Sequence, residues 1–269
     1  MDFRPLVIKI GGSVLERLHS SFFQECGQLM EQGYHPVVIH GGGPEISRIQ
    51  KRLGLSARFV DGLRMTDDEG LKVVEMVLAG RINKSLIARF WAFQVSVVGI
   101  SGADGGLLQV KPKDPALGWV GEMTAVHPRL LCNLWESGWI PVVASLGLDD
   151  SGNLYNVNAD TAAGAIAREL AAERLILVTD VPGIWKREGE VKKFLSQVTP
   201  EQVQKMIQSG EIAGGMIPKV RAALTGLEAA RCGVLITDGS IPGCLGSETG
   251  TRIVKEATSD DVVPHLSTK

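Results

Sequence analysis

The chain has 269 residues, of which 44% are hydrophobic, so it is long enough for one large α/β unit or two lobes with a sizeable core. Its 28 basic and 30 acidic residues nearly cancel and form no basic cluster, which argues against nucleic acid or an anionic membrane as the main partner. The sequence has no leader-type N-terminus and no apolar run of about eighteen residues, so we expect a cytoplasmic protein without a membrane span.

The four cysteines are scattered and show no C-x-x-C spacing. This pattern is typical of reduced thiols and not of a disulfide framework or a zinc site. The five histidines are not grouped with acidic or cysteine ligands either, so we expect no metal held by the protein itself.

The first predicted strand, 6–10, contains a lysine among apolar residues and runs into a glycine pair. Burying the Lys9 ammonium is costly unless an anion lies beside it. The amides of Gly11 and Gly12 can approach a ligand closely, which favours a phosphate cradle with one fixed cation. The alternative is an edge strand whose Lys9 points into water, followed by an ordinary turn.

A second strand, 37–39, also ends in glycines, at His40-Gly41-Gly42-Gly43. The helix between the two strands is predicted from a capping box at Ser21 to Gly33. Both glycine loops open toward helices, which is where ligands bind in open parallel sheets.

After the second glycine loop, a helix is predicted to begin with a capping box at Thr66 and to run to about Leu78, with a further helical stretch over 82–93. After a strand at 95–100, the segments 107–110 and 119–123 predict an antiparallel hairpin that builds a lid or substrate wall.

In the C-terminal half of the chain, predicted strands again end in polar or glycine-containing loops. Asp160 opens an alanine-rich helix to Leu170, and Thr199 begins a capping box. The remaining elements are expected at 128–137 (helix), 140–144 (strand), 175–178 (strand), 186–193 (charged hairpin), 219–232 (helix), 234–237 (strand) and 251–254 (strand).

Several familiar sites are excluded by inspection. No lysine follows a glycine, so a Walker G-x-x-x-x-G-K loop cannot occur. The third position of a dinucleotide fingerprint is Ile46, and no G-x-S-x-G elbow exists. Glycine loops with the isolated lysines Lys9 and Lys219 instead suit binding a polyphosphate and transferring its terminal group.

From residue 6 to residue 254, the chain resembles the amino acid kinase family, and within it the members that act on N-acetyl-L-glutamate. The motifs that carry the resemblance are Ile8-Lys9-Ile10-Gly11-Gly12, His40-Gly41-Gly42-Gly43, Gly62-Leu63-Arg64-Met65-Thr66, Asn156-Val157-Asn158-Ala159-Asp160, Thr179-Asp180-Val181-Pro182-Gly183, Gly214-Gly215-Met216-Ile217-Pro218-Lys219 and Gly250-Thr251-Arg252. The resemblance implies a three-layer αβα sandwich around a largely parallel open sheet, in two lobes. The lobe 1–170 would bind the acyl amino acid and dimerise, and the lobe 171–269 would bind ATP.

The resemblance also implies the reaction, which is ATP-dependent phosphorylation of the γ-carboxylate of N-acetyl-L-glutamate in arginine biosynthesis. Lys9 and Lys219 would stabilise the transferring phosphoryl group, and Asp160 would hold both lysines in place. Mg²⁺ would arrive with ATP, held mainly by its phosphates.

For the substrates, the implied ligands of N-acetylglutamate are Gly42, Gly43, Arg64 and Asn156. The implied ligands of ATP and its phosphates are Gly11, Gly12, Asp180, Val181, Pro182, Gly183, Ile184, Trp185, Glu211, Ile212, Ala213, Gly214 and Gly215. Arginine-inhibited members carry an extra helix before the first strand, whereas eight residues precede Lys9 here. We therefore expect a homodimer with weak or no arginine feedback.

Other interpretations of the same residues stay open. Arg64 can be a surface residue before a helix, Asp160 can cap its helix, and Asn156 and Asn158 can be turn residues; the choice between these two asparagines depends on the resemblance alone. The protein can also be a sibling kinase for protein-linked aminoadipate, aspartate or glutamate, or a non-catalytic nucleotide-binding or storage protein on the same fold.

Overall fold

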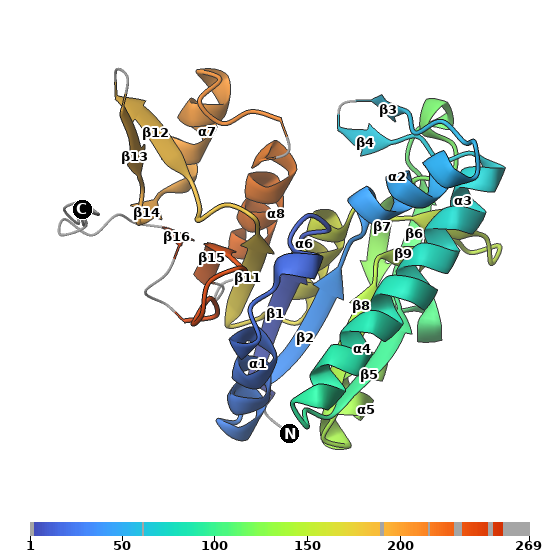
Figure 1. Cartoon of the computed structure of the whole chain (residues 1–269), viewed down its shortest axis with the longest axis horizontal. Coiled ribbons are helices and arrows are strands. Elements are labelled where there is room, and N and C mark those ends of the chain that lie inside the picture. Colours follow the sequence, from blue (N-terminus) through green and yellow to red (C-terminus); the bar gives the residue numbers. More distant parts are fainter. Residues whose placement is uncertain are drawn as a thin grey trace.

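The computed structural model describes residues 3–60, 62–188, 191–214, 216–228, 233–246 and 250–254. It is an α/β structure with an eight-stranded sheet in the order β14-β16-β15-β11-β1-β2-β8-β5 and helices on both faces (Figure 1). All neighbouring strands are parallel except β15 and β16. The predicted αβα sandwich around a largely parallel sheet is confirmed.

Seven of the eight strands of this sheet match predicted segments, and the two-residue strand at 197–198 was not predicted. The eight strands are β1 (Pro5–Ile10), β2 (His35–His40), β5 (Val97–Ser101), β8 (Ile140–Ala144), β11 (Arg174–Thr179), β14 (Gln197–Val198), β15 (Gly233–Asp238) and β16 (Thr251–Ile253). β1 lies at the centre, paired with β2 on one side and β11 on the other. Both of its faces are therefore covered, and every residue of the strand is buried.

Successive side chains of β1 enter two different cores, as the alternation of a strand requires. Leu6, Ile8 and Ile10 pack with α1 (Ser21–Glu31), α3 (Asp68–Glu75) and α4 (Asn83–Ala92). Val7 packs instead with α5 (Arg129–Glu136), α6 (Ala159–Glu169), α7 (Pro200–Gln208) and α8 (Met216–Glu228). Because Lys9 alternates with Val7, the strand directs its side chain toward α6.

Three smaller sheets flank the main one. The predicted antiparallel hairpin is confirmed as β6 (Leu108–Pro112) and β7 (Gly121–Val126), but it belongs to a four-stranded sheet with β9 (Leu146–Leu148) and β10 (Leu154–Asn156), which the sequence did not predict. β3 (Phe59–Val60) pairs with β4 (Leu63–Arg64), and the charged hairpin is β12 (Trp185–Glu188) with β13 (Val191–Phe194).

Two of the three predicted capping boxes are wrong. Thr199 forms the predicted box with Gln202. The helix near Thr66 instead begins after Asp67, because that carboxylate accepts a hydrogen bond from Gly70 N at 2.8 Å. α1 begins after Ser20, which makes no side-chain cap bond.

The helices α3 and α4 are joined without a break, whereas the sequence predicted two separate stretches. The joint is the π-helix η2 (Met76–Ile82). Short 3₁₀ turns are η1 (Leu15–Arg17), η3 (Asp104–Gly106) and η4 (Pro115–Leu117). In the ranges that the structure describes, no helix is long and apolar enough to cross a bilayer. Cys26 and Cys132 are free thiols, Cys244 is buried, and Cys232 lies outside the described residues.

Candidate active site

The centre of the candidate site is an ion pair between β1 and α6. Lys9 Nζ lies 2.8 Å from Asp160 Oδ1, and the two residues are only 4% and 6% exposed. Oδ1 has no aligned hydrogen bond among the described residues, so the lysine holds it by charge. The alternative in which Lys9 points from an edge strand into water is wrong, because β1 is central and the ammonium is buried beside a carboxylate.

Lys219 completes a cluster of charges at this point. It lies in the first turn of α8, and α8 packs along α6. Burial and the charge of Lys9 lower its pKa, whereas Asp160 and Asp180 raise it, and the net direction is down. Two lysines and two carboxylates from β1, α6, α8 and the end of β11 thus interact electrostatically across the space between the sheet and α8.

Asp180 follows β11 directly and is the more exposed of the two acids. Burial raises the pKa of its carboxyl. Hydrogen bonds from its own backbone, Thr179 and Ser13 and the charge of Lys219 together lower the pKa by more than burial raises it, so the net pKa is below its usual range. Arg17 Nη2 lies 3.6 Å from Asp180 Oδ2. The carboxylate therefore stays ionised and tied to the loop after β1.

The two glycine loops after β1 and β2 touch one another. A Cβ on Gly12 would come within 2.9 Å of both Gly43 N and Pro44 Cδ, so only glycine permits this approach. α2 (Gly43–Arg52) begins here with Gly42 as its N-cap. The first amides of a helix have no intrahelical partner and carry the positive end of its dipole, which suits an anion. Gly11 N–H donates to Val178 O at 2.8 Å and so belongs to the sheet.

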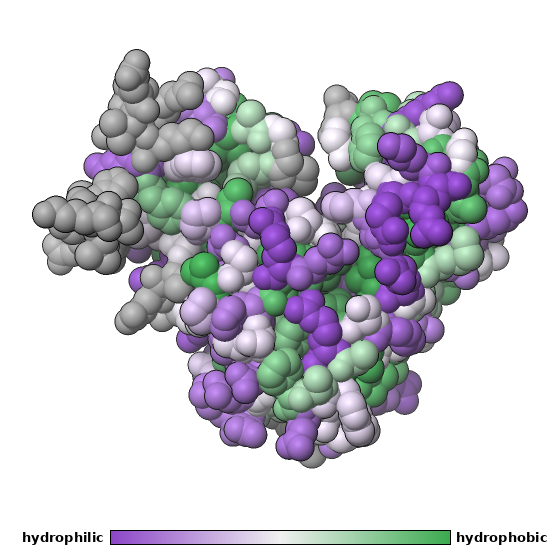
Figure 2. Space-filling view, viewed as in Figure 1, coloured by the Kyte–Doolittle hydropathy of each residue, from purple (hydrophilic) through white to green (hydrophobic). Residues whose placement is uncertain are grey.

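A cavity of about 290 Å³ opens beside these loops, and Figure 2 shows the surface hollowed between α8 and the β3–β4 hairpin. It brings together seven of the residues that the sequence singled out, namely Lys9, Gly12, Gly42, Gly43, Arg64, Asn156 and Asp160. Its floor is charged, and Phe59, Leu63, Leu78, Val120 and Val157 supply apolar walls. The hollow is therefore shaped for a small anionic molecule with a short apolar stem.

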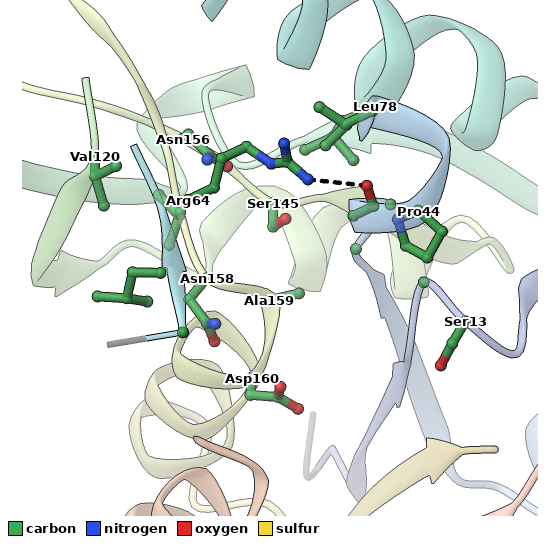
Figure 3. Close-up of a pocket in the computed structure, with 18 of the residues that line it drawn as sticks. Ser13, Pro44, Arg64, Leu78, Val120, Ser145, Asn156, Asn158, Ala159 and Asp160 are labelled. Atoms are coloured by element: carbon green, nitrogen blue, oxygen red, sulfur yellow. Dashed lines mark hydrogen bonds between the residues drawn. The ribbon is translucent and has the colours of Figure 1, made fainter. Parts of the chain in front are cut away.

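Arg64 crosses one side of the cavity from β4 to the first turn of α2 (Figure 3). Its guanidinium donates to Gln50 Oε1 at 2.7 Å, to Ser47 Oγ at 2.7 Å and to Gly43 O at 3.0 Å. The Phe59 ring lies over it, with 4.7 Å from ring centroid to Cζ. Burial lowers its pKa, and at 8% exposure the surface alternative for Arg64 is wrong.

The tandem asparagines have different roles. Asn158 is the N-cap of α6, because its Oδ1 accepts from Thr161 N at 3.0 Å. Asp160 lies in the first turn of that helix and is not its cap. Asn156 Nδ2 donates to Thr66 Oγ1 at 3.1 Å, which fixes its amide on the cavity wall. Of the two, Asn156 keeps its side-chain oxygen available to a ligand.

Of the residues predicted to bind nucleotide, Gly12 lines this cavity, whereas the segments 180–185 and 211–214 do not. The loop from β11 into β12 consists of Asp180, Val181, Pro182, Gly183, Ile184 and Trp185. Within it, Ile184 N donates to Thr251 Oγ1 at 2.8 Å. The connection from α7 to α8 contains Glu211, Ile212, Ala213 and Gly214. Ile212 is buried, and the other three residues are exposed. Gly215 lies outside the described residues.

Sequence inspection missed several residues of the site. Ser13 lines the cavity and donates to Asp180, and its position directly after the glycine pair was the available signal. Phe59 and Ser145 come from segments without a distinctive pattern, and only the folded chain brings them here. Within the described residues, no group of three or more His, Cys, Asp or Glu side chains could hold a metal ion.

Comparisons with known proteins agree with this geometry. The acetylglutamate kinase of Geobacillus kaustophilus (strain HTA426) is 48% identical over 255 residues, which cover 94% of this chain and 97% of that protein. The acetylglutamate kinase of Methanopyrus kandleri is 42% identical over 239 residues, covering 86% and 94%.

Solved structures show the same fold. A protein of Streptococcus mutans UA159 matches with a TM-score of 0.85 and 30% identity over 94% of this chain and 99% of that one. N-acetylglutamate synthase from Neisseria gonorrhoeae, solved with coenzyme A and N-acetyl-glutamate, matches with a TM-score of 0.82 and 25% identity over 95% of this chain and 60% of that one. A family model described as the amino acid kinase family matches residues 4–238. The chain therefore belongs to the amino acid kinase family.

Proposed function

We propose that the protein is an acetylglutamate kinase, which transfers the γ-phosphoryl group of ATP to the γ-carboxylate of N-acetyl-L-glutamate in arginine biosynthesis. The observation that carries the proposal is the buried Lys9–Asp160 pair with Lys219 beside it, at the end of a small anion-binding cavity. Phosphoryl transfer needs cations and positioning more than covalent help, and these residues supply both.

The roles follow from what each group can do. The acceptor carboxylate is already ionised at neutral pH, so it attacks phosphorus without a general base. Lys9 and Lys219 would neutralise charge on the phosphoryl oxygens, and Asp160 would keep the two ammonium groups oriented. The amides of Gly12, Gly42 and Gly43 would receive the phosphoryl group and the acceptor carboxylate.

The other end of the substrate would lie against Arg64 and Asn156. The guanidinium would bind the α-carboxylate, and the Asn156 amide would bind the acetamido group. A cavity of about 290 Å³ is at the lower end of small-molecule sites, which are roughly 300–1,000 Å³, and suits one acylated amino acid.

ATP would lie across the loop 180–185 and the segment 211–215 in the lobe 171–269, while the lobe 1–170 would hold the acyl amino acid. Mg²⁺ fits as part of the Mg–ATP substrate, because this ion commonly keeps phosphate oxygens and water as ligands. Its charge would then add to that of the two lysines on the transferring group.

The experiment that tests the proposal measures ADP release from Mg–ATP with N-acetylglutamate, glutamate, aspartate or no acceptor, and traps the acyl phosphate with hydroxylamine. We expect turnover and a trapped hydroxamate with N-acetylglutamate only. Turnover with another acceptor alone would favour a sibling kinase, and ATP binding without any turnover would favour a non-catalytic nucleotide-binding protein.

Replacing Arg64 by lysine is expected to raise the KM for N-acetylglutamate by about tenfold or more, with a smaller change in kcat. Lysine keeps one charge but loses the planar fork that reaches Gln50 and the first turn of α2. The matched control is Arg48→Lys, an exposed arginine of α2 paired with Glu45, which should leave KM within about twofold. Equal effects of the two substitutions would contradict this role for Arg64.

A homodimer in the cytoplasm completes the proposal. β5 is the last strand of the eight-stranded sheet, so one of its edges has no partner strand within the described chain. Trp91 on the neighbouring α4 is 74% exposed, which favours burial against a second copy. Light scattering tests the dimer. The free thiols Cys26 and Cys132 suit a reducing compartment such as the cytoplasm.

A further inference from the structure

We infer that His40 and Asn83 are positioning residues that aim the Gly42 amide into the active site through one fixed histidine tautomer. The inference rests on the proposed function, in which Gly42 N–H binds the reacting anion. Neither side chain lines the cavity, and both are 0% exposed. Two fully buried polar side chains directly behind a glycine loop need partners, and these partners define what the pair does.

The orientation of the Asn83 amide is set by the sheet. Its Nδ2 lies 2.9 Å from Val142 O on β8 and 3.2 Å from Ile100 O on β5. Backbone carbonyls only accept hydrogen bonds, so the NH₂ group must be the one that faces them. Lys84 Nζ donates to Asn83 Oδ1 at 3.0 Å from the other side, which agrees with this orientation.

The amide in turn sets the tautomer of His40. The same Nδ2 also lies 3.3 Å from His40 Nε2, although its two hydrogens already face the two carbonyl oxygens. An amide nitrogen accepts no hydrogen bond, so a proton on Nε2 would find no acceptor there, and the ring form without that proton is the one that fits. The proton of the neutral ring is then on Nδ1, which lies 3.1 Å from Gly41 O and donates to it. Burial and the charge of Lys84 lower the pKa of His40 to about 4 against the raising effect of the Gly41 hydrogen bond, so the ring is neutral at pH 7.

The carbonyl of Gly41 and the amide of Gly42 belong to one planar trans peptide, so their C=O and N–H point in opposite directions. Holding Gly41 O on the His40 ring therefore turns Gly42 N–H away from the ring. Gly42 is the N-cap of α2 and lines the cavity. The direction of the Gly42 amide is thus set, through His40, by Asn83 of α4, which does not line the cavity.

The π-helix η2 holds the other side of the same glycine. A Cβ on Gly42 would come within 2.3 Å of Ile82 Cδ1 and 2.7 Å of Leu78 Cδ2, so η2 packs directly on the loop. Asn83 follows Ile82 in the chain and begins α4. Two consecutive residues therefore hold the loop, with Ile82 against Gly42 and Asn83 against His40.

Nitrogen-15 NMR of the histidine rings in the wild-type protein tests the tautomer without any variant or turnover. We expect His40 to show a protonated Nδ1 and an unprotonated Nε2 from about pH 6 to pH 8, assigned by the loss of this signal in His40→Asn. A protonated Nε2 would overturn the inference, even in an enzyme that phosphorylates N-acetylglutamate. An inactive wild type with the expected tautomer would count against the proposed function and not against the positioning of Gly42 by His40 and Asn83.

Steady-state kinetics test whether the hydrogen bond from His40 to Gly41 O supports catalysis. His40→Leu keeps the side-chain volume but loses the donor to Gly41 O. We expect kcat to fall at least about tenfold, by analogy with losing a preorganised donor. The KM values for ATP and N-acetylglutamate should change less. In His40→Asn the side-chain NH₂ stands near the position of Nδ1, and kcat should recover to within about threefold of the wild type. Leu131→Ala, a fully buried truncation on α5, controls for lost stability and should keep kcat within about twofold. A His40→Asn enzyme as slow as His40→Leu, or a Leu131→Ala enzyme with the same fall, would overturn the inference.

Discussion

Replacing Lys9 or Lys219 by alanine is expected to lower kcat by at least ~10², which is the cost of removing one preorganised donor from a developing anion. In the proposed mechanism both ammonium groups act on the transferring phosphoryl group, Lys9 from β1 and Lys219 from α8. Steady-state kinetics with Mg–ATP and N-acetylglutamate measure the effect, and KM for both substrates should change much less than kcat.

Lys9→Ala also leaves the Asp160 carboxylate buried without its ion-pair partner, and removal of one partner from such a pair typically costs about 3–5 kcal/mol of stability. Thermal unfolding of each variant separates this cost from the chemistry. Lys205→Ala, an exposed lysine of α7, is the matched control and should leave kcat within about twofold. Near-normal turnover in both Lys9→Ala and Lys219→Ala would contradict the mechanism.

Asp160→Asn is expected to lower kcat by about tenfold or more and to move the alkaline limb of its pH profile to lower pH. Burial and Lys9 lower the pKa of Lys219, and Asp160 opposes them. Without the carboxylate this opposing effect is lost, so the pKa of Lys219 falls further. In the proposed mechanism Lys219 must be protonated to stabilise the phosphoryl oxygens. We therefore expect the variant to lose activity at a lower pH than the wild type, as the pH rises through the pKa of Lys219.

The measurement is kcat at saturating substrate from about pH 6 to pH 10 for the wild type and the variant. Glu136→Gln makes the same acid-to-amide change on the exposed side of α5 and should leave the profile in place. An alkaline limb that stays where it is in Asp160→Asn would show that this carboxylate does not support the charge of Lys219.

Local sequence indicated most of the strands and helices and which residues to expect in the candidate site. The apolar runs of β1, β2, β8 and β11 predict buried parallel strands because both faces of such a sheet are covered. The glycine loops follow from the same local logic, since a strand that ends in glycine before a helix builds an anion site. Lys9 was identifiable because a lysine inside an apolar strand requires a counter-charge.

Tertiary structure alone decided which partners these residues have. The strand order, with β11 and β2 on either side of β1, depends on packing between distant segments, and so does the meeting of Lys9 with Asp160 and Lys219. The sequence could not show that β6 and β7 join β9 and β10, because local patterns do not specify strand partners. It could not show the continuous helix through η2 either, because local patterns do not specify the width of a helical turn. The contact of Asn83 with His40 spans 43 residues, and it exists only because two strands and a helix come together there.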